Sequence, residues 1–159
     1  MRKVLLAVVL FVLAGCSSNE PAPAVPRPRI DFTIAGKKTT AKPFIYCDIK
    51  VEDCRRDNAA MLKLPVPPGT AVTVTVPKEV ADTPWSVVIE YKTVAGEQKN
   101  PVTVATFAPG KETTFDALPP EAGAQLQTVE VKQAGGVMIQ SDTGPEPVTR
   151  AAWSLQVTA

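Results

Sequence analysis

Apolar and polar residues alternate along much of the chain with a period of two, the spacing that turns one face of a β-strand toward a core. In residues 71–76, valines at 72, 74 and 76 alternate with threonines at 73 and 75. Residues 85–92 repeat the pattern, with Trp85, Val87, Ile89 and Tyr91 in one phase. Both segments are predicted to be strands with one buried face.

Similar runs recur between dense Pro and Gly turn signals. Further runs that could form strands lie at 30–34, 44–51, 61–64, 102–107, 113–115, 126–132, 137–139 and 153–157. In 44–51, Cys47, Ile49 and Val51 share one phase, and the phase slip between Leu126 and Val129 indicates a bulge. Only residues 77–82 could form a helical turn. The sequence predicts an all-β fold, an immunoglobulin-like antiparallel sandwich of seven to nine short strands, with a small closed barrel as the alternative.

The first residues form an export signal. Met1-Arg2-Lys3 is positively charged and residues 4–14 are apolar, too short a run for a membrane-spanning helix of about 20 residues. Leu13-Ala14-Gly15-Cys16 matches the lipobox of bacterial lipoproteins, in which cleavage leaves an acylated cysteine at the new N-terminus. An ordinary signal peptide with a cysteine nearby by chance is the alternative. We predict lipidation, with fatty acids such as palmitate, at Cys16.

These signals divide the chain into three parts. Residues 1–15 are the lipoprotein signal peptide, residues 16–29 a lipidated linker with prolines at 21, 23, 26 and 28, and residues 30–159 the β-sandwich domain. Alternating Pro and Ala favours extended chain, so the linker acts as a tether. The expected location is the extracytoplasmic face of the cell membrane, which the N-terminal lipid binds.

Charge and composition exclude several classes of function. The 144 residues after the signal carry 15 basic and 16 acidic side chains, which gives no reason to expect nucleic acid as a partner. The chain has no histidine, the commonest general base and a preferred zinc ligand. We therefore expect a protein that is not an enzyme, with no catalytic residue, cofactor or metal ligand.

Two cysteines remain once Cys16 is lipidated. An even pair in an exported protein indicates a disulfide, here between Cys47 and Cys54. The alternative, a redox or metal pair, needs a Cys-x-x-Cys spacing or further ligands that the sequence lacks. A structural disulfide is the prediction.

Two groups of side chains are candidates for chemistry. Acidic and basic residues surround the cysteine pair, and they are Asp48, Glu52, Asp53, Asp57, Arg55 and Arg56. They could hold calcium, but a self-neutralised surface loop fits better because no calcium-loop motif is present. The second group is aromatic: Phe44, Tyr46, Trp85, Tyr91 and Trp153 could line a ligand cleft, although aromatic residues at strand spacing more often form the core.

Several short motifs together resemble an actinobacterial family of lipoproteins known only as a domain of unknown function. They are the lipobox, Tyr46-Cys47-Asp48 with Cys54, residues 67–77 from Pro-Pro-Gly to Val-Pro, residues 81–86 with Pro84-Trp85-Ser86, and Trp153-Ser154-Leu155-Gln156-Val157. The resemblance implies an actinobacterial envelope with the plasma membrane as anchor. It implies no activity, substrate or catalytic residue.

Three functions are compatible with these features. The first is a lipid-anchored, non-catalytic envelope module that binds another envelope protein or assists cell-wall or lipid assembly. The alternative is a carrier with a cavity in the sandwich for a lipid or small apolar ligand. The third and weakest is a hydrolase that uses carboxylates among Asp48, Glu52, Asp53 and Asp57.

Overall fold

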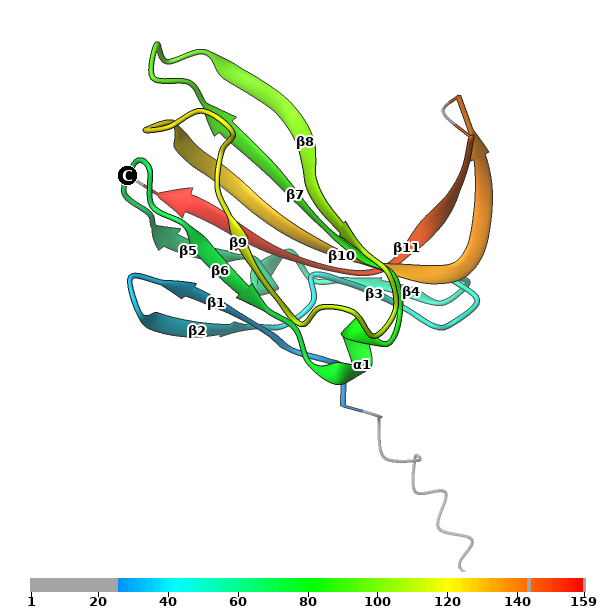
Figure 1. Cartoon of the computed structure of the whole chain (residues 1–159). Helices are drawn as coiled ribbons and strands as arrows, with labels where there is room; N and C mark the ends of the chain where they lie inside the picture. The colour runs from blue at the N-terminus through cyan, green and yellow to red at the C-terminus, as the bar shows by residue number, and fades with distance from the viewer. Residues whose placement is uncertain (1–25, 143, 159) are drawn as a thin grey trace, which may run out of the picture.

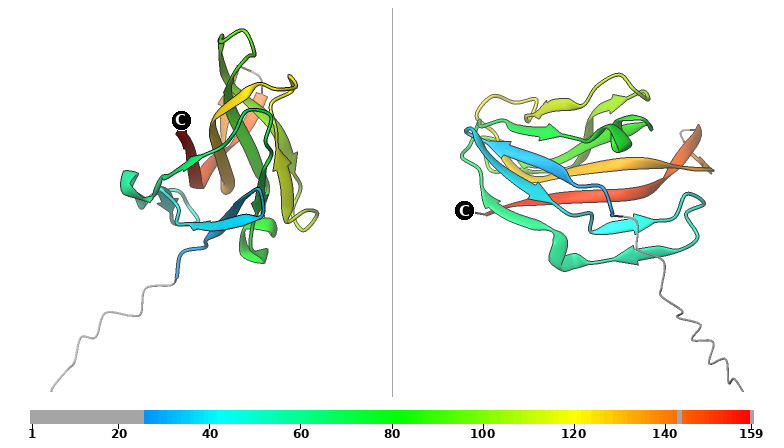
Figure 2. Two further views of the ribbon diagram at one scale, coloured as in Figure 1. Left: turned by 90° about the vertical axis from the view of Figure 1, so that its left-hand side faces the viewer. Right: turned by 90° about the horizontal axis from the view of Figure 1, so that it is seen from below.

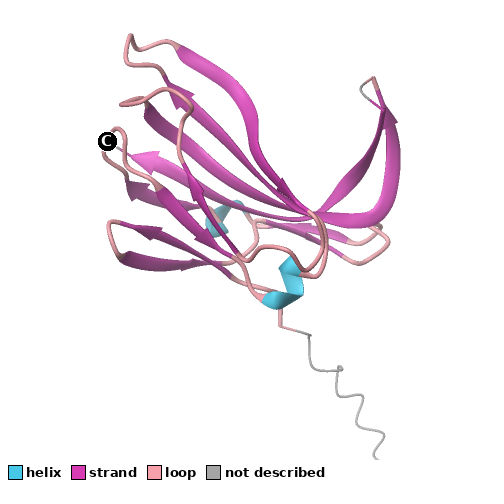
Figure 3. Ribbon diagram, in the orientation of Figure 1, coloured by secondary structure: helices cyan, strands magenta, loops and turns pink. Residues whose placement is uncertain are grey.

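The computed structural model describes residues 26–142 and 144–158, and in them two β-sheets pack face to face. Figure 1 shows the smaller sheet lying across one side of the larger, and Figure 3 shows that strands and turns make up nearly all of the fold. The observed fold class is therefore the predicted all-β sandwich.

The smaller sheet, sheet A, has the strand order β2-β1-β6-β9. Its strands are β1 (Ile30–Ile34), β2 (Lys37–Ala41), β6 (Val72–Thr75) and β9 (Thr114–Ala117), all antiparallel to their neighbours. Even-numbered residues in β1 and β6 face inward: Ile30, Phe32, Val72 and Val74 are each at most 1% exposed. Period-two alternation thus builds one wall of the core.

The larger sheet, sheet B, has the order β4-β3-β11-β10-β7-β8. Its strands are β3 (Ile45–Cys47), β4 (Cys54–Arg56), β7 (Trp85–Lys92), β8 (Gln98–Phe107), β10 (Gln125–Ser141) and β11 (Gly144–Thr158), together with β5 (Leu62–Pro65). The pairing is antiparallel except that β5 runs parallel to β11. The predicted antiparallel sandwich is confirmed, and the parallel pairing of β5 with β11 was not predicted.

The strands β10 and β11 extend well beyond the rest of sheet B. Their pairing with β7 and β3 ends at Gln133 and Ala151, and beyond these residues they pair only with each other. We call residues 135–142 and 144–150 the arm. Figure 1 shows the arm bending away from the sandwich, at the opposite end from the C-terminal end of β11.

Two short helical segments connect strands. The turn η1 (Asn58–Ala60) precedes β5, and α1 (Lys78–Ala81) follows β6, where a helical turn was predicted. Buried Gln133 in β10 holds α1 in place, because its Nε2 donates to the Thr83 hydroxyl at 3.0 Å and to the Glu79 carbonyl at 3.3 Å. Its Oε1 has no hydrogen-bond partner within the described residues.

The interior of the sandwich is occupied by one cluster of buried aliphatic and aromatic side chains. Trp85 and Trp153 are the largest fully buried residues, and each indole N–H is paired: Trp85 donates to the Glu112 carbonyl and Trp153 to the Pro28 carbonyl. Trp85 also stacks on Phe107 with ring centroids 4.3 Å apart. Pairing of both donors removes the cost of burying them.

The sequence located most strands but misjudged three features. The structure has eleven strands in its described part, not seven to nine. Strand β3 ends at Cys47, so Ile49 and Val51 lie in a turn rather than on a core-facing strand, and Ile49 is 68% exposed. Gly135-Gly136 does not separate two strands, because β10 continues through both. The Asp48 carboxylate accepts from the backbone N–H of Glu52, and this local bond favours the turn over a longer strand.

Candidate functional site

The predicted lipidation site, Cys16, lies outside the described residues. The first described residues pack against the domain, since Pro28 is buried and its carbonyl accepts from Trp153 Nε1 at 3.3 Å. Contact with the sandwich thus begins before β1. Within the described residues, no helix is long and apolar enough to span a membrane.

Cys47 and Cys54 form the predicted disulfide, with their sulfur atoms 2.01 Å apart. The two residues face each other in the β3–β4 pair, where Cys47 closes β3 and Cys54 opens β4. The disulfide therefore links the two ends of the turn that contains Ile49 and Val51. Burial of Cys47 and the strand register fit a structural role for the pair.

Replacing both cysteines with alanine is expected to lower the free energy of unfolding by about 2.5 kcal/mol, the loop entropy of a short closed ring. Urea unfolding of the double variant Cys47→Ala/Cys54→Ala measures this. The reduced wild-type protein is the matched control and should lose a similar amount. Equal free energies of unfolding for the oxidised, reduced and double-variant proteins would show that the disulfide does not stabilise the fold.

Two acidic residues near the disulfide accept hydrogen bonds from nearby backbone N–H groups. Asp48 Oδ1 accepts from the N–H groups of Glu52 at 2.8 Å and Asp53 at 3.3 Å, and Asp57 Oδ1 caps η1 by accepting from Ala59 N–H at 3.0 Å. In the described part of the chain, no group of three or more acidic, cysteine or histidine residues is arranged to hold a metal ion. The bonds of Asp48 and Asp57 to backbone N–H groups fit a surface loop.

The aromatic residues do not gather around one cleft. Phe44, Trp85, Tyr91 and Trp153 are buried, whereas Tyr46 is half-buried at the surface. Trp85 also borders a cleft on the outer side of sheet B. The core interpretation of the aromatic pattern therefore fits the geometry better than a shared ligand site.

Tyr46 is the centre of a cluster that sequence reasoning missed. The guanidinium carbon of Arg27 lies 5.6 Å from the Tyr46 ring centroid and that of Arg150 lies 5.3 Å from it. Arg150 also donates to the Tyr46 hydroxyl at 3.1 Å and to the Cys47 carbonyl at 3.3 Å. Cation–π contacts thus join the first described residues, β3 and the base of the arm.

The outer face of sheet B carries two clefts lined mainly by polar side chains. The first, of about 290 Å³, lies where the arm meets the sheet, and its lining includes Ser86, Thr103, Thr106, Lys132 and Glu146. The second, of about 470 Å³, lies toward the opposite end of the same strands, and its lining includes Glu90, Gln98, Lys99, Thr128 and Gln156. We call the surface that contains both clefts the outer face.

Side chains on the outer face are partly paired with one another. Thr128 donates to Glu90 at 3.3 Å, and Lys132 lies 3.4 Å from Glu130. The Glu97 carboxylate accepts a hydrogen bond from Lys99, and this bond raises the pKa of the Lys99 ammonium group. The outer face therefore offers donors and acceptors of both charges, which suits a polar partner.

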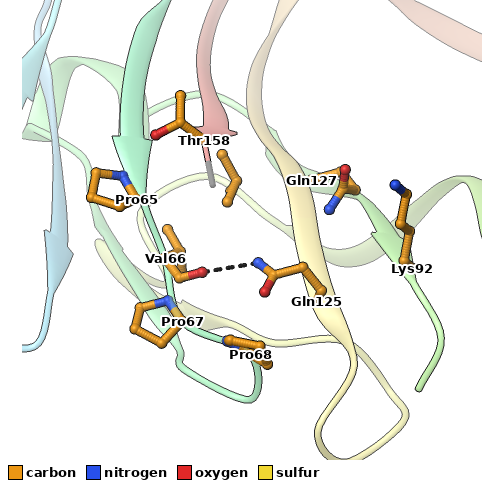
Figure 4. Close-up of a pocket in the computed structure, with 9 residues that line it drawn as sticks. Pro65, Val66, Pro67, Pro68, Lys92, Gln125, Gln127 and Thr158 are labelled. Carbon is orange, nitrogen blue, oxygen red and sulfur yellow. Dashed lines mark hydrogen bonds between the residues drawn. The ribbon is translucent and has the colours of Figure 1, made fainter. Parts of the chain in front are cut away.

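A third cleft, of about 480 Å³, lies at the end of the sandwich farthest from the arm (Figure 4). Prolines at 65, 67 and 68 form one side, and Lys92, Gln125 and Gln127 approach from strands β7 and β10. Gln125 Nε2 donates to the Val66 carbonyl at 2.9 Å across the cleft. Its size falls in the range of ligand sites, roughly 300–1,000 Å³, but its lining mixes polar and apolar groups.

The arm exposes consecutive apolar side chains that the sequence analysis treated as an ordinary strand. Val137, Met138 and Ile139 are 38%, 57% and 53% exposed. The sequence could have indicated this exposure, because three apolar residues in a row cannot all face one side of a strand. Two glycines before them and a polar turn after them set this segment apart.

A scan against family models matched residues 23–158 to the model described as a protein of unknown function, DUF2771. Neither the comparison with curated proteins nor that with solved structures found a match. The match covers all of the described residues, including the two buried tryptophans Trp85 and Trp153. The chain therefore belongs to the DUF2771 family of proteins of unknown function.

Proposed function

We propose that the protein is a lipid-anchored, non-catalytic module of the cell envelope that binds another envelope protein through the outer face. The lipobox at Leu13-Ala14-Gly15-Cys16 supports the anchor and the extracytoplasmic location. The observation that carries the binding role is the contrast between a filled interior and an outer face with two polar clefts.

The two clefts have the properties of a surface for reversible protein binding. Both are open to solvent and lie on the same side of sheet B, so a partner could contact both without a change in the fold. Their linings combine hydroxyl, amide, ammonium and carboxylate groups, which can exchange bonds with water for bonds with a partner. A polar surface of this kind fits a non-obligate complex.

Photo-cross-linking in native membranes tests this proposal. A photoreactive residue at Thr103, which is exposed in β8, is expected to give a discrete cross-linked product. The same residue at Lys37, exposed in β2 on the far sheet, is the matched control and should give none. Adding Thr106→Arg beside Thr103 should abolish the product through steric and charge conflict with the partner. Equal products at positions 103 and 37, or a product insensitive to Thr106→Arg, would contradict specific binding there.

The carrier function has one observation in its favour, the size of the third cleft. Its location is the gap between the β5–β6 connection and β10, which the Gln125–Val66 hydrogen bond bridges. A carrier would retain lipid or a small apolar molecule through purification, and native mass spectrometry would detect it as added mass. The module function predicts the mass of the acylated chain alone.

A further inference from the structure

The exposed aliphatic residues of the domain are concentrated in one place. Seven large apolar residues of the described chain are exposed, and four of them are Ile49, Val137, Met138 and Ile139. The other three, Val94, Val102 and Leu118, lie in the β7–β8 turn, in β8 and after β9. Scattered residues of this kind are normal on protein surfaces, but a cluster marks an interaction site.

Two glycines allow this cluster to form. A Cβ atom on Gly135 would lie 2.7 Å from Val51 Cγ2, and one on Gly136 would lie 3.5 Å from the Ile49 carbonyl oxygen. The turn between β3 and β4 therefore lies directly against the start of the arm, and Figure 2 shows both at the same end of the molecule. We call Ile49, Val137, Met138 and Ile139 the arm patch; because successive residues of a strand face opposite sides, the patch covers both faces of the arm.

The chain that leads to Cys16 contacts the residues at the base of the arm before it leaves the domain. Arg27 stacks on Tyr46, and Arg150 at the base of the arm stacks on the same ring. Ile49 follows Tyr46 by three residues, a separation of at most about 10 Å along an extended chain. Cys16 lies ten positions before Pro26 in the sequence, and this stretch can span at most about 35 Å. A lipid on Cys16 would thus hold the arm patch within reach of the bilayer.

We propose that the arm patch rests in the interfacial layer of the same membrane that holds the lipid on Cys16. This inference rests on the proposed lipid anchor. Four aliphatic side chains bury too little area to hold a free protein on a membrane, but a tethered domain needs only a weak second contact, because the tether sets a high effective concentration. Exposed Lys50, Arg55 and Arg56 lie in the same β3–β4 segment as Ile49 and can reach lipid phosphates. Asp48 in this segment is engaged by backbone N–H groups, whereas Glu52 and Asp53 are exposed and offset part of the positive charge.

Docking through the arm patch gives the domain a fixed orientation. The far cleft of the outer face, lined by Gln98 and Lys99, lies at the other end of the long strands from the arm. It would then point away from the bilayer, toward other proteins of the envelope. The anchor, the arm patch and the outer face thus take three separate roles.

Site-specific fluorescence on the acylated full chain tests this inference. The protein would be reconstituted into protein-free vesicles of phosphatidylcholine and phosphatidylglycerol, with an environment-sensitive label attached through Ile49→Cys. The label is expected to shift to shorter emission wavelength and to lose most of its quenching by iodide. A label attached through Ala95→Cys, in the exposed β7–β8 turn, is the matched control and should remain fully quenchable.

Substitutions in the arm separate lipid contact from other causes of protection. Met138→Asp/Ile139→Asp should restore iodide quenching at position 49 while the acyl chains still hold the protein on the vesicles. Val94→Asp, which places the same charge on an exposed aliphatic site outside the patch, should leave the label protected. These results together would support docking.

Three outcomes would overturn the inference, and they are distinguishable. A label at position 49 that stays quenchable on vesicles, with fatty acid present on Cys16 by mass spectrometry, rejects docking alone. Quenching on vesicles but protection in native membranes shows that a protein, and not lipid, covers the patch. Fatty acid missing from Cys16 in the native protein rejects the anchor, and docking with it.

Discussion

Replacing Cys16 with alanine is expected to remove nearly all of the protein from the membrane fraction and to leave it either secreted or uncleaved. Each buried methylene of an acyl chain contributes about 0.8 kcal/mol, so two chains form a stable anchor that four surface aliphatic residues cannot replace. Membrane fractionation with immunoblotting, together with the mass of the product, measures both outcomes. Ser17→Ala, one residue further, is the matched control and should behave as wild type.

Normal cleavage with unchanged membrane association in Cys16→Ala would contradict the lipid anchor. It would also remove the basis for docking of the arm patch, since that contact depends on the tether. The sandwich fold and the disulfide would stand, because both are features of the described residues.

Trp153→Ala is expected to have the largest effect on stability, a loss of about 3–5 kcal/mol in the free energy of unfolding. Trp153 is fully buried in β11, and its indole N–H pairs with the Pro28 carbonyl at the start of the described chain. The substitution therefore leaves a cavity in the core and releases the segment that enters the domain. Urea denaturation followed by circular dichroism measures the loss.

Trp153→Phe separates the two contributions. It keeps most of the apolar contact but leaves the Pro28 carbonyl without its donor, so a smaller loss of about 1–3 kcal/mol is expected. Val94→Ala, at a residue 68% exposed, should change stability by less than about 0.5 kcal/mol. A loss below about 1 kcal/mol in Trp153→Ala would mean that the core does not depend on this residue.

The parts of the fold that the sequence predicted well are those in which local pattern and tertiary burial agree. Strand β7 matches the predicted 85–92, and Trp85, Val87, Ile89 and Tyr91 are all buried. The phase slip after Leu126 appears as a register shift against β7. In such segments one face of the sheet is buried in the core and the other is exposed to solvent. The two-residue period of apolar side chains is then enough to predict the strand and its buried face.

The arm could not be predicted in this way. Its strands are not covered by a second sheet, so no alternation between buried and exposed faces is imposed on Val137, Met138 and Ile139. Pro145 and Pro147, which usually interrupt strands, are tolerated because β11 has no second neighbour along the arm. The pair Gly135-Gly136 looks like a turn in the sequence. In the structure the two glycines lie within β10 and let the β3–β4 turn pack closely against it.

The candidate site depends on contacts between residues far apart in the chain. Arg27 and Arg150 meet on Tyr46, and the outer face combines side chains of β7, β8, β10 and β11. Neither the Tyr46 cluster nor the outer face has a characteristic spacing in the sequence, because the order of strands in the sheet brings their residues together. The disulfide was predictable since its two cysteines are the pair left after the lipobox cysteine, and their short separation fits one hairpin.

The proposed account gives each part of the chain a separate physical role. Acyl chains on Cys16 would hold the protein at the membrane, the arm patch would orient the domain, and the outer face would bind a partner. The filled core and the Trp153–Pro28 contact keep the chain's entry point fixed relative to the arm. This contact would make the proposed orientation a property of the fold.

The mass of the N-terminal peptide from protein extracted from its own membranes tests the central claim most directly. The account predicts a mature chain that begins at Cys16 and carries a diacylglyceryl group on the thiol. A mature chain that begins at another residue, or an unmodified Cys16 in membrane-bound protein, would contradict it.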